Sequence, residues 1–370
     1  MIDKLIEGRL LTVIVGSVFR LVEVFVRAIH LGVRGLAALV QNALTSPIDA
    51  WMSVFGKRMV ARRVAVDGSS IVIIEQDGEY AGDPKYVAEE LLRRAAPYRI
   101  TWVLRPQSVG PYPREFHFVR YGTADYVRAV AAAKVVVHSG RCLQQSGVVN
   151  RSGQHWLHTG PGLTLGHPRN DILFHTSPEA AGELRKKALD RLGIADTGQR
   201  LALFTPARGD GARGAPLSGI DFIRLRAALS ERFGGTWDIL IRVHGSGTAP
   251  SDLSLAGLPA YCHNASSYPD VQELLVLADA GIADRSRWLC DYLLTGKPAF
   301  VFCAQRDQAR GCDEHLPLAT SNDELLAQIA GFDPEAHRHR IEQFLKARGS
   351  GDDGSAARRV VDRIEELMAR

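Results

Sequence analysis

The residues most suited to binding an anion lie in the stretch Asp284-Arg285-Ser286-Arg287. This stretch follows the short apolar run at 280–283, which predicts a strand, and it precedes apolar residues at helical spacing, Trp288, Leu289, Tyr292 and Leu293. Free backbone N–H groups and the helix dipole favour an anion at a helix N-terminus, and an arginine can bind two phosphate oxygens at once. The stretch therefore predicts a phosphate site, the alternative being an ordinary helix cap with solvated arginines.

Two other polar segments directly follow predicted strands. Thr205-Pro206-Ala207-Arg208 comes at the end of a strand expected at 201–205, and Arg242-Val243-His244 at the end of one expected at 238–243. The carboxyl ends of parallel strands lie at one edge of the sheet, and ligands bind beyond that edge. Three successive strands would thus bring arginine, histidine, aspartate and serine together. We interpret this convergence as a ligand site; the alternative is that these are ordinary polar loops.

Strands and helices alternate from Ser69 onward, which predicts parallel sheets covered on both faces. In the first half we expect strands at 71–75, 100–104, 116–120 and 134–138, with helices at 84–96 and 124–133. A region rich in glycine, proline and histidine follows at 139–175. In the second half we expect helices at 178–192, 220–233 and 271–278, strands at 201–205, 238–243, 280–283 and 299–302, and a tail at 334–370 that is helical except at 349–355. The prediction is an α/β protein with two Rossmann-like domains facing across a cleft.

The N-terminal segment, residues 1–65, differs from the rest in its charge and its pattern. It holds nine Lys/Arg against four Asp/Glu, whereas the remainder holds 36 against 37, so the whole excess of +4 is N-terminal. Its charged residues form a narrow stripe on an otherwise apolar helix, a pattern typical of helices that lie in a membrane interface. No uncharged run there is long enough to cross a bilayer. We expect this segment to associate with an anionic membrane surface; the alternative is an arm packed on the protein itself or on a partner.

This distribution of charge does not suit a nucleic-acid-binding protein, which would need a broad basic face. The five cysteines are odd in number and form no CxxC pair. They therefore predict neither a disulfide framework nor a zinc site, and fit small buried residues in a reducing compartment.

Eight short blocks, taken in order, resemble those of one family: Gly82-Asp83-Pro84-Lys85, Tyr121-Gly122 through Val136, Arg151-Ser152-Gly153-Gln154, Gly166-His167-Pro168-Arg169-Asn170-Asp171, Phe204-Thr205-Pro206-Ala207-Arg208, Arg242-Val243-His244, Asp284-Arg285-Ser286-Arg287 with Asp291-Tyr292, and Asp352-Asp353-Gly354-Ser355. The family is that of the CDP-glycerol glycerophosphotransferases, the teichoic-acid primases and polymerases and their capsule-synthesis relatives. The blocks span about residues 69–370, and their order makes the signal more specific than any one of them.

The resemblance implies a GT-B fold and transfer of glycerol phosphate, or a related alditol phosphate, from a CDP-activated donor to a cell-envelope glycan or lipid-linked acceptor. It implies peripheral attachment to the cytoplasmic face of the inner membrane, and no metal or other cofactor. Three parts follow, namely the N-terminal segment (1–65), a shortened acceptor-side domain (66–175) and a donor-nucleotide domain (176–370). Carried over residue by residue, the donor site comprises Arg169, Pro206, Ala207, Arg242, His244, Asp284, Ser286, Arg287 and Asp291.

Two histidines are the catalytic candidates that the resemblance implies. His244 would stabilise or protonate the departing phosphate, and His158 would take the proton of the acceptor hydroxyl. The family's Trp-His-Gly-Thr-Pro block is altered here, and His158 occupies the histidine position only if the alignment shifts by three residues. Two other functions therefore stay open: a relative that binds nucleotide or acts as a scaffold without catalysis, and a GT-B glycosyltransferase.

Overall fold

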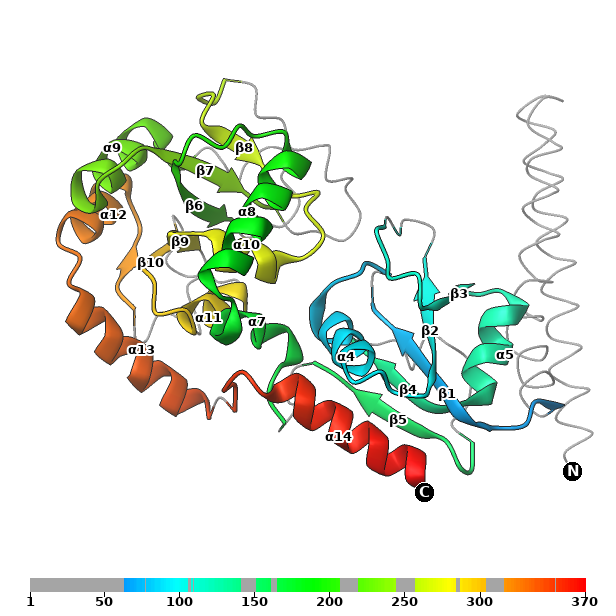
Figure 1. Ribbon diagram of the computed structural model, residues 1–370. Coiled ribbons are helices and arrows are strands. Elements are labelled where there is room, and N and C mark those ends of the chain that lie inside the picture. Colours follow the sequence, from blue (N-terminus) through cyan, green and yellow to red (C-terminus); the bar gives the residue numbers. More distant parts are fainter. Residues whose placement is uncertain are drawn as a thin grey trace, which may run out of the picture.

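The computed structural model describes residues 63–76, 78–105, 108, 110–140, 151–160, 165–206, 219–243, 257–283, 287–303, 316–349 and 351–370, without the side chains of 287 and 348. These residues form two α/β lobes, each built on a parallel sheet (Figure 1). The predicted amphipathic segment lies outside the described residues, apart from its last three. Among the helices that are described, none is long and apolar enough to span a membrane.

The first lobe has a five-stranded sheet in the order β3-β2-β1-β4-β5, with every pair parallel. Its strands are β1 (Asp67–Ile74), β2 (Arg99–Leu104), β3 (His117–Arg120), β4 (Ala133–His138) and β5 (His155–His158). Helices α4 (Gly82–Arg93) and α5 (Ala124–Ala132) lie between these strands along the chain. The run at 71–74 is fully buried because apolar clusters cover both faces of this sheet, as expected for a parallel sheet.

The second lobe has a six-stranded parallel sheet in the order β11-β10-β9-β6-β7-β8. Its strands are β6 (Arg200–Thr205), β7 (Trp237–Ile241), β8 (Cys262–Asn264), β9 (Ala280–Ala283), β10 (Ala299–Phe302) and β11 (Leu318–Ala319). Its helices are α8 (Pro178–Leu192), α9 (Phe222–Phe233), α10 (Val271–Leu277), α11 (Arg287–Leu293), α12 (Asn322–Ala330) and α13 (Pro334–Arg348). Two further apolar clusters cover the two faces of this sheet.

Local sequence signals explain where several helices begin and end. Helix α8 starts at Ser177, whose hydroxyl accepts the Ala180 amide, has Pro178 at its first position, and ends at Gly193 in the left-handed conformation. Because these signals lie in the local sequence, the bounds of this helix could be predicted, and the expected helix at 178–192 is confirmed. The prediction missed the short strands β5, β8 and β11 and the nine-residue helix α12.

The C-terminal helix α14 (Ala356–Ala369) departs from the predicted division of the chain. It packs on the first lobe, where Val360, Val361 and Ile364 join the apolar cluster of Ile71 and Ile73 (Figure 1). An amphipathic pattern identifies the face that a helix buries but does not say which sheet covers it. The described chain thus crosses between lobes twice, through the short helices η2 (Pro168–Asn170) and α7 (Ile172–His175) and again before α14.

The carboxyl ends of the two sheets face each other. The arrowheads of β1 and β7 point toward the space between the lobes (Figure 1). The charge of Glu79, which follows β1, also acts to raise the pKa of Arg242, which follows β7. The carboxyl ends of strands from both sheets therefore border the space between the lobes, as the Rossmann-like architecture predicts.

Candidate functional site between the two lobes

Two histidines end neighbouring strands of the first sheet. His138 ends β4 and His158 ends β5, and the two residues are register partners. Their ring centroids lie 5.2 Å apart, with the rings tilted by 56°. His138 is only 2% exposed, whereas His158 is exposed at the edge of the sheet. Of the two rings, only that of His158 is therefore accessible from the surface.

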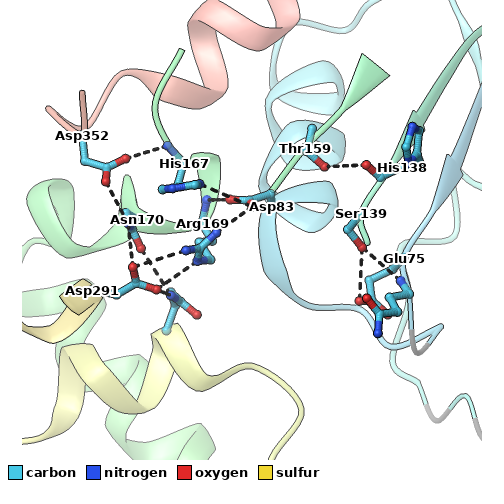
Figure 2. A network of polar contacts seen from close by, with 12 residues as sticks. Glu75, Asp83, His138, Ser139, Thr159, His167, Arg169, Asn170, Asp291 and Asp352 are labelled. Carbon is cyan, nitrogen blue, oxygen red and sulfur yellow. Dashed lines mark hydrogen bonds and ion pairs between the residues drawn. The ribbon is translucent and has the colours of Figure 1, made fainter. Parts of the chain in front are cut away.

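Close backbone packing fixes this edge. The Thr159 amide and hydroxyl both donate to the His138 carbonyl oxygen, at 2.8 and 3.3 Å (Figure 2). A Cβ at Gly160 would lie 3.0 Å from Cε1 of His158, so glycine leaves the space that the imidazole occupies. Next to this pair, the Ser139 hydroxyl accepts the Gln76 amide at 3.0 Å and lies 3.5 Å from the Glu75 carboxylate. The edge therefore combines two imidazoles, a hydroxyl and a carboxylate.

Burial and, to a smaller extent, the neighbouring His158 lower the pKa of His138 to about 4, against an opposing effect of the Gly140 backbone. His138 is therefore neutral at neutral pH. Sequence reasoning did not select this residue, although it ends the predicted strand at 134–138. The signal that could have identified His138 is its pairing with His158 at the ends of neighbouring strands. Recognising this pairing requires the register of β5 against β4.

We expect His138 to make folding sensitive to acid. The folded pKa lies below the ordinary value of about 6.5, so the unfolded chain binds more protons between these values and stability falls as pH drops from about 6.5 to about 4. At pH 5 this residue should cost about 2 kcal/mol relative to pH 7. Urea unfolding of wild type and His138→Asn at both pH values measures the difference. His339→Asn removes an exposed histidine and is the control; an equal pH dependence in His138→Asn and wild type would contradict the assignment.

Arg242 is the arginine at the edge of the second sheet. Its amide donates to the Phe204 carbonyl at 2.9 Å, and its Nη1 donates to the Tyr268 carbonyl at 2.6 Å. Burial lowers the pKa of the guanidinium, while Glu79 and Asp270 act in the opposite direction from a distance. Among the described residues no carboxylate lies within ion-pair distance of it. A partly buried guanidinium without a carboxylate partner in the described part of the chain suits an anionic ligand.

Arg169, in contrast, is already paired on two sides. Its Nη1 lies 2.7 Å from the Asp83 carboxylate of α4, and its Nε lies 2.9 Å from the Asp291 carboxylate of α11 (Figure 2). The carboxylates raise the pKa of the guanidinium despite its burial. For Asp83, burial opposes ionisation, but His167 and Arg169 outweigh it and lower the pKa. The structure thus brings the predicted residues Arg169 and Asp291 together as an ion pair between the lobes.

Amide side chains complete this arrangement. Nδ2 of Asn170 lies 3.2 Å from both the Asp291 and the Asp352 carboxylates, and Nε2 of Gln272 donates to Asp291 at 2.9 Å. The His167 amide donates to Asp352 at 2.6 Å. Sequence reasoning did not anticipate Asp83 or Gln272 as partners, because they belong to segments far apart in the chain.

The remaining predicted site residues are Pro206 and five others. Pro206 directly follows β6, at the same edge as Arg242. Ala207, His244, Asp284, Ser286 and the side chain of Arg287 lie outside the described residues, so their predicted roles stay predictions. In the part of the chain that is described, no three histidine, cysteine, aspartate or glutamate side chains are grouped to hold a metal ion.

Comparison with known proteins places this architecture in a family context. The sequence matches the family described as CDP-Glycerol:Poly(glycerophosphate) glycerophosphotransferase over residues 57–166 and 155–366. It is 27% identical over 214 residues to the teichoic acid poly(ribitol-phosphate) polymerase of Bacillus spizizenii, covering 55% of this chain and 33% of that protein. It is 24% identical over 226 residues to the teichoic acid poly(glycerol phosphate) polymerase of Staphylococcus epidermidis, covering 57% and 30%. The alignments thus span about a third of each relative.

Among solved structures, the wall teichoic acid polymerase TagF is similar over 89% of this chain and 96% of that one, with a TM-score of 0.68 and 19% identity. A TagF variant soaked with CDPG gives a TM-score of 0.70, with the same identity and coverage. At this identity the likeness shows the fold, and the predicted GT-B architecture with two parallel sheets is confirmed.

Proposed function

Because this chain belongs to the CDP-glycerol:poly(glycerophosphate) glycerophosphotransferase family, we propose that it transfers glycerol phosphate, or a related alditol phosphate, from a CDP-activated donor to a cell-envelope glycan or lipid-linked acceptor. One observation carries the proposal. His158, whose imidazole is exposed, ends a strand of one sheet, and Arg242 directly follows a strand of the other; the carboxyl edges of the two sheets face each other. One supplies a proton acceptor, and the other supplies a positive charge without a carboxylate partner in the described residues.

The reaction divides between the two lobes. An acceptor hydroxyl oxygen attacks the phosphorus that carries the glycerol, the bond from this phosphorus to the bridging oxygen of CMP breaks, and a phosphodiester and CMP result. His158 takes the hydroxyl proton during the attack. Arg242 binds the diphosphate and stabilises the charge that develops on the departing CMP phosphate. His244 and the Ser286 loop, predicted to serve the same phosphates, would complete the donor side.

Removing the Arg242 charge tests the donor site. We expect Arg242→Gln to weaken CDP-glycerol binding by about 10- to 100-fold, because hydrogen bonds to charged groups contribute about 1.5–3 kcal/mol. Binding of cytidine, which lacks phosphates, should not change. Isothermal titration calorimetry with both ligands measures this.

Arg226→Gln is the matched control. Its Nε donates to the Trp237 carbonyl at 2.8 Å, so it too is an arginine bonded to a backbone oxygen, but near the opposite end of β7. Equal losses of CDP-glycerol binding in both variants would contradict the role of Arg242.

Release of CMP from CDP-glycerol by the wild-type protein separates the possible functions. Release supports transfer, whereas binding without release would support a protein that binds nucleotide or acts as a scaffold. If the protein neither binds CDP-glycerol nor releases CMP from it, a CDP-alditol donor is contradicted. A comparison of CDP-glycerol with CDP-ribitol identifies the alditol.

We further propose that residues 1–65 attach the protein to the cytoplasmic face of the inner membrane, and that the acceptor is presented there. The excess of basic residues in this segment supports the proposal, since about 1 kcal/mol of attraction to an anionic surface is typical for each basic residue. Deletion of this segment should abolish flotation with anionic liposomes. Unchanged flotation would contradict the proposal.

A further inference from the structure

The first turn of α4 contacts the second lobe through two residues of opposite charge, Asp83 and Lys85. Both are buried, at 4% and 6% exposure. Asp83 reaches Asp291 of α11 through Arg169, as described above. Lys85 reaches the start of α10 directly: its Nζ lies 2.7 Å from the Asp270 carboxylate and 2.6 Å from the Glu273 carboxylate. We refer to these six residues, Asp83, Lys85, Arg169, Asp270, Glu273 and Asp291, as the ionic bracket.

Neighbouring hydroxyls fix the geometry at the lysine end. The Tyr86 hydroxyl donates to Asp270 at 2.9 Å, and the Tyr268 hydroxyl donates to Glu273. Burial lowers the pKa of Lys85, but Asp270, Glu89 and Glu273 outweigh it, so the pKa is raised and the lysine is charged. The Lys85 charge of α4 is thus bound by two carboxylates of the second lobe, which fixes the position of α4 against α10.

The apolar contacts do not provide such a constraint. Each of the four apolar clusters formed by described residues belongs to one lobe, and none combines strands of both sheets. The ionic bracket, by contrast, is satisfied in one position of α4 relative to α10 and α11. Moving Asp83 into the place of Lys85 would bring it against Asp270 and Glu273, and like charges at such an interface are strongly unfavourable.

We propose that Asp83 and Lys85 are positioning residues, which hold the sheet of His158 and the sheet of Arg242 in the one relative orientation that transfer requires. The kinetic part rests on the proposed function. The two half-sites lie on different lobes, so a change of orientation alters the distance between the acceptor hydroxyl and the donor phosphorus without altering either half-site. A displacement of 1 Å can reduce turnover about 100-fold.

The test uses a double variant, Lys85→Met with Asp270→Asn, in the full chain. The single change Lys85→Met would leave buried carboxylates without compensation and so destabilise the fold. In the double variant Glu273 keeps Lys187, 3.4 Å away, and Tyr268. Spin labels replace two exposed alanines, Ala124 on α5 and Ala227 on α9, through a non-natural azide-bearing residue that avoids the native cysteines.

We expect a single narrow distance between the labels in the wild-type protein and a broadened distribution in the double variant. Donor affinity should stay within about twofold, since the donor half-site is intact, while CMP release falls about 100-fold. Lys187→Met is the matched control: Lys187 binds the same Glu273 but belongs to the same lobe, so it should leave distance and turnover unchanged. If the ionic bracket only stabilised the fold, the double variant would be less stable, but its rate of CMP release would not fall by a larger factor than its donor affinity.

Two results would overturn the proposal. One is an unchanged narrow distance in the double variant, and the other is a broad distribution in the wild-type protein. If the wild-type protein releases no CMP, the proposed function fails, but the distance measurement still tests the ionic bracket by itself.

Discussion

Replacing His158 with asparagine is expected to lower the rate of CMP release by about 10²- to 10⁴-fold, the usual contribution of a general base. Asparagine keeps a polar side chain at the end of β5 but cannot accept the hydroxyl proton. Donor affinity should remain that of the wild type, because the donor site lies on the other lobe. Rapid-quench measurement of CMP release, with calorimetry of CDP-glycerol binding, separates the two quantities.

His155→Asn is the matched control for this variant. His155 begins the same four-residue strand, so it tests whether loss of an imidazole from β5 alone disturbs the lobe. It should leave turnover within about twofold, because it lies at the opposite edge of the sheet from the proposed proton transfer. Equal turnover in His158→Asn and wild type would show that another group takes the proton, with Glu75 of the same edge the next residue to test.

Replacing Arg169 with methionine is expected to destabilise the protein by about 3–5 kcal/mol, because it leaves the carboxylates of Asp83 and Asp291 buried without their counter-charge. These carboxylates are only 4% and 8% exposed. The loss should be largest at neutral pH. The depressed pKa of Asp83 means that its stabilisation is present above its ordinary pKa and disappears as the pH falls through the folded value. Urea unfolding at pH 7 and at pH 3 measures both effects.

Arg128→Met provides the comparison for an exposed pair. Arg128 lies 2.9 Å from Asp125, but their side chains are 61% and 76% exposed, so the change should cost less than about 1 kcal/mol. The experiment also decides between two roles for Arg169. Loss of stability with unchanged donor affinity supports the ionic bracket. Loss of donor affinity at unchanged stability supports the phosphate-binding role that the family resemblance implies.

The elements that could be predicted are those whose signals are local. The buried run of β4 and the capped helix α8 carry their own limits in the sequence, through β-branched residues in one case and Ser177, Pro178 and Gly193 in the other. Strands β8 and β11 have three and two residues, too few for a periodic pattern. Their assignment depends on backbone hydrogen bonds to a neighbouring strand, which the sequence does not display.

The same distinction applies to the site. The rule that polar residues collect at the carboxyl ends of parallel strands correctly placed Arg242 at the edge of the second sheet. That rule says nothing about partners, and partners distinguish Arg242 from Arg169. Asp83, Arg169 and Asp291 come from three segments of the chain, and their ion pairs exist only once the two lobes meet. The sequence shows the charge of each residue, but it does not show which partner neutralises that charge.

The return of α14 to the first lobe has a mechanical consequence. The two crossings of the chain lie side by side, because Asp352 of the second crossing accepts hydrogen bonds from the His167 amide and the Asn170 amide group of the first. Asp171 likewise accepts the amides of Ala356 and Ala357, at 3.0 and 2.7 Å. Because the two crossings are bonded to each other, they form a pivot, a hinge between the lobes. Any rotation of one lobe relative to the other must therefore be smallest at the crossings and largest in the parts of the lobes that lie farthest from them. Cutting the chain at residue 349 would remove half of this pivot and uncover the apolar face of the first sheet.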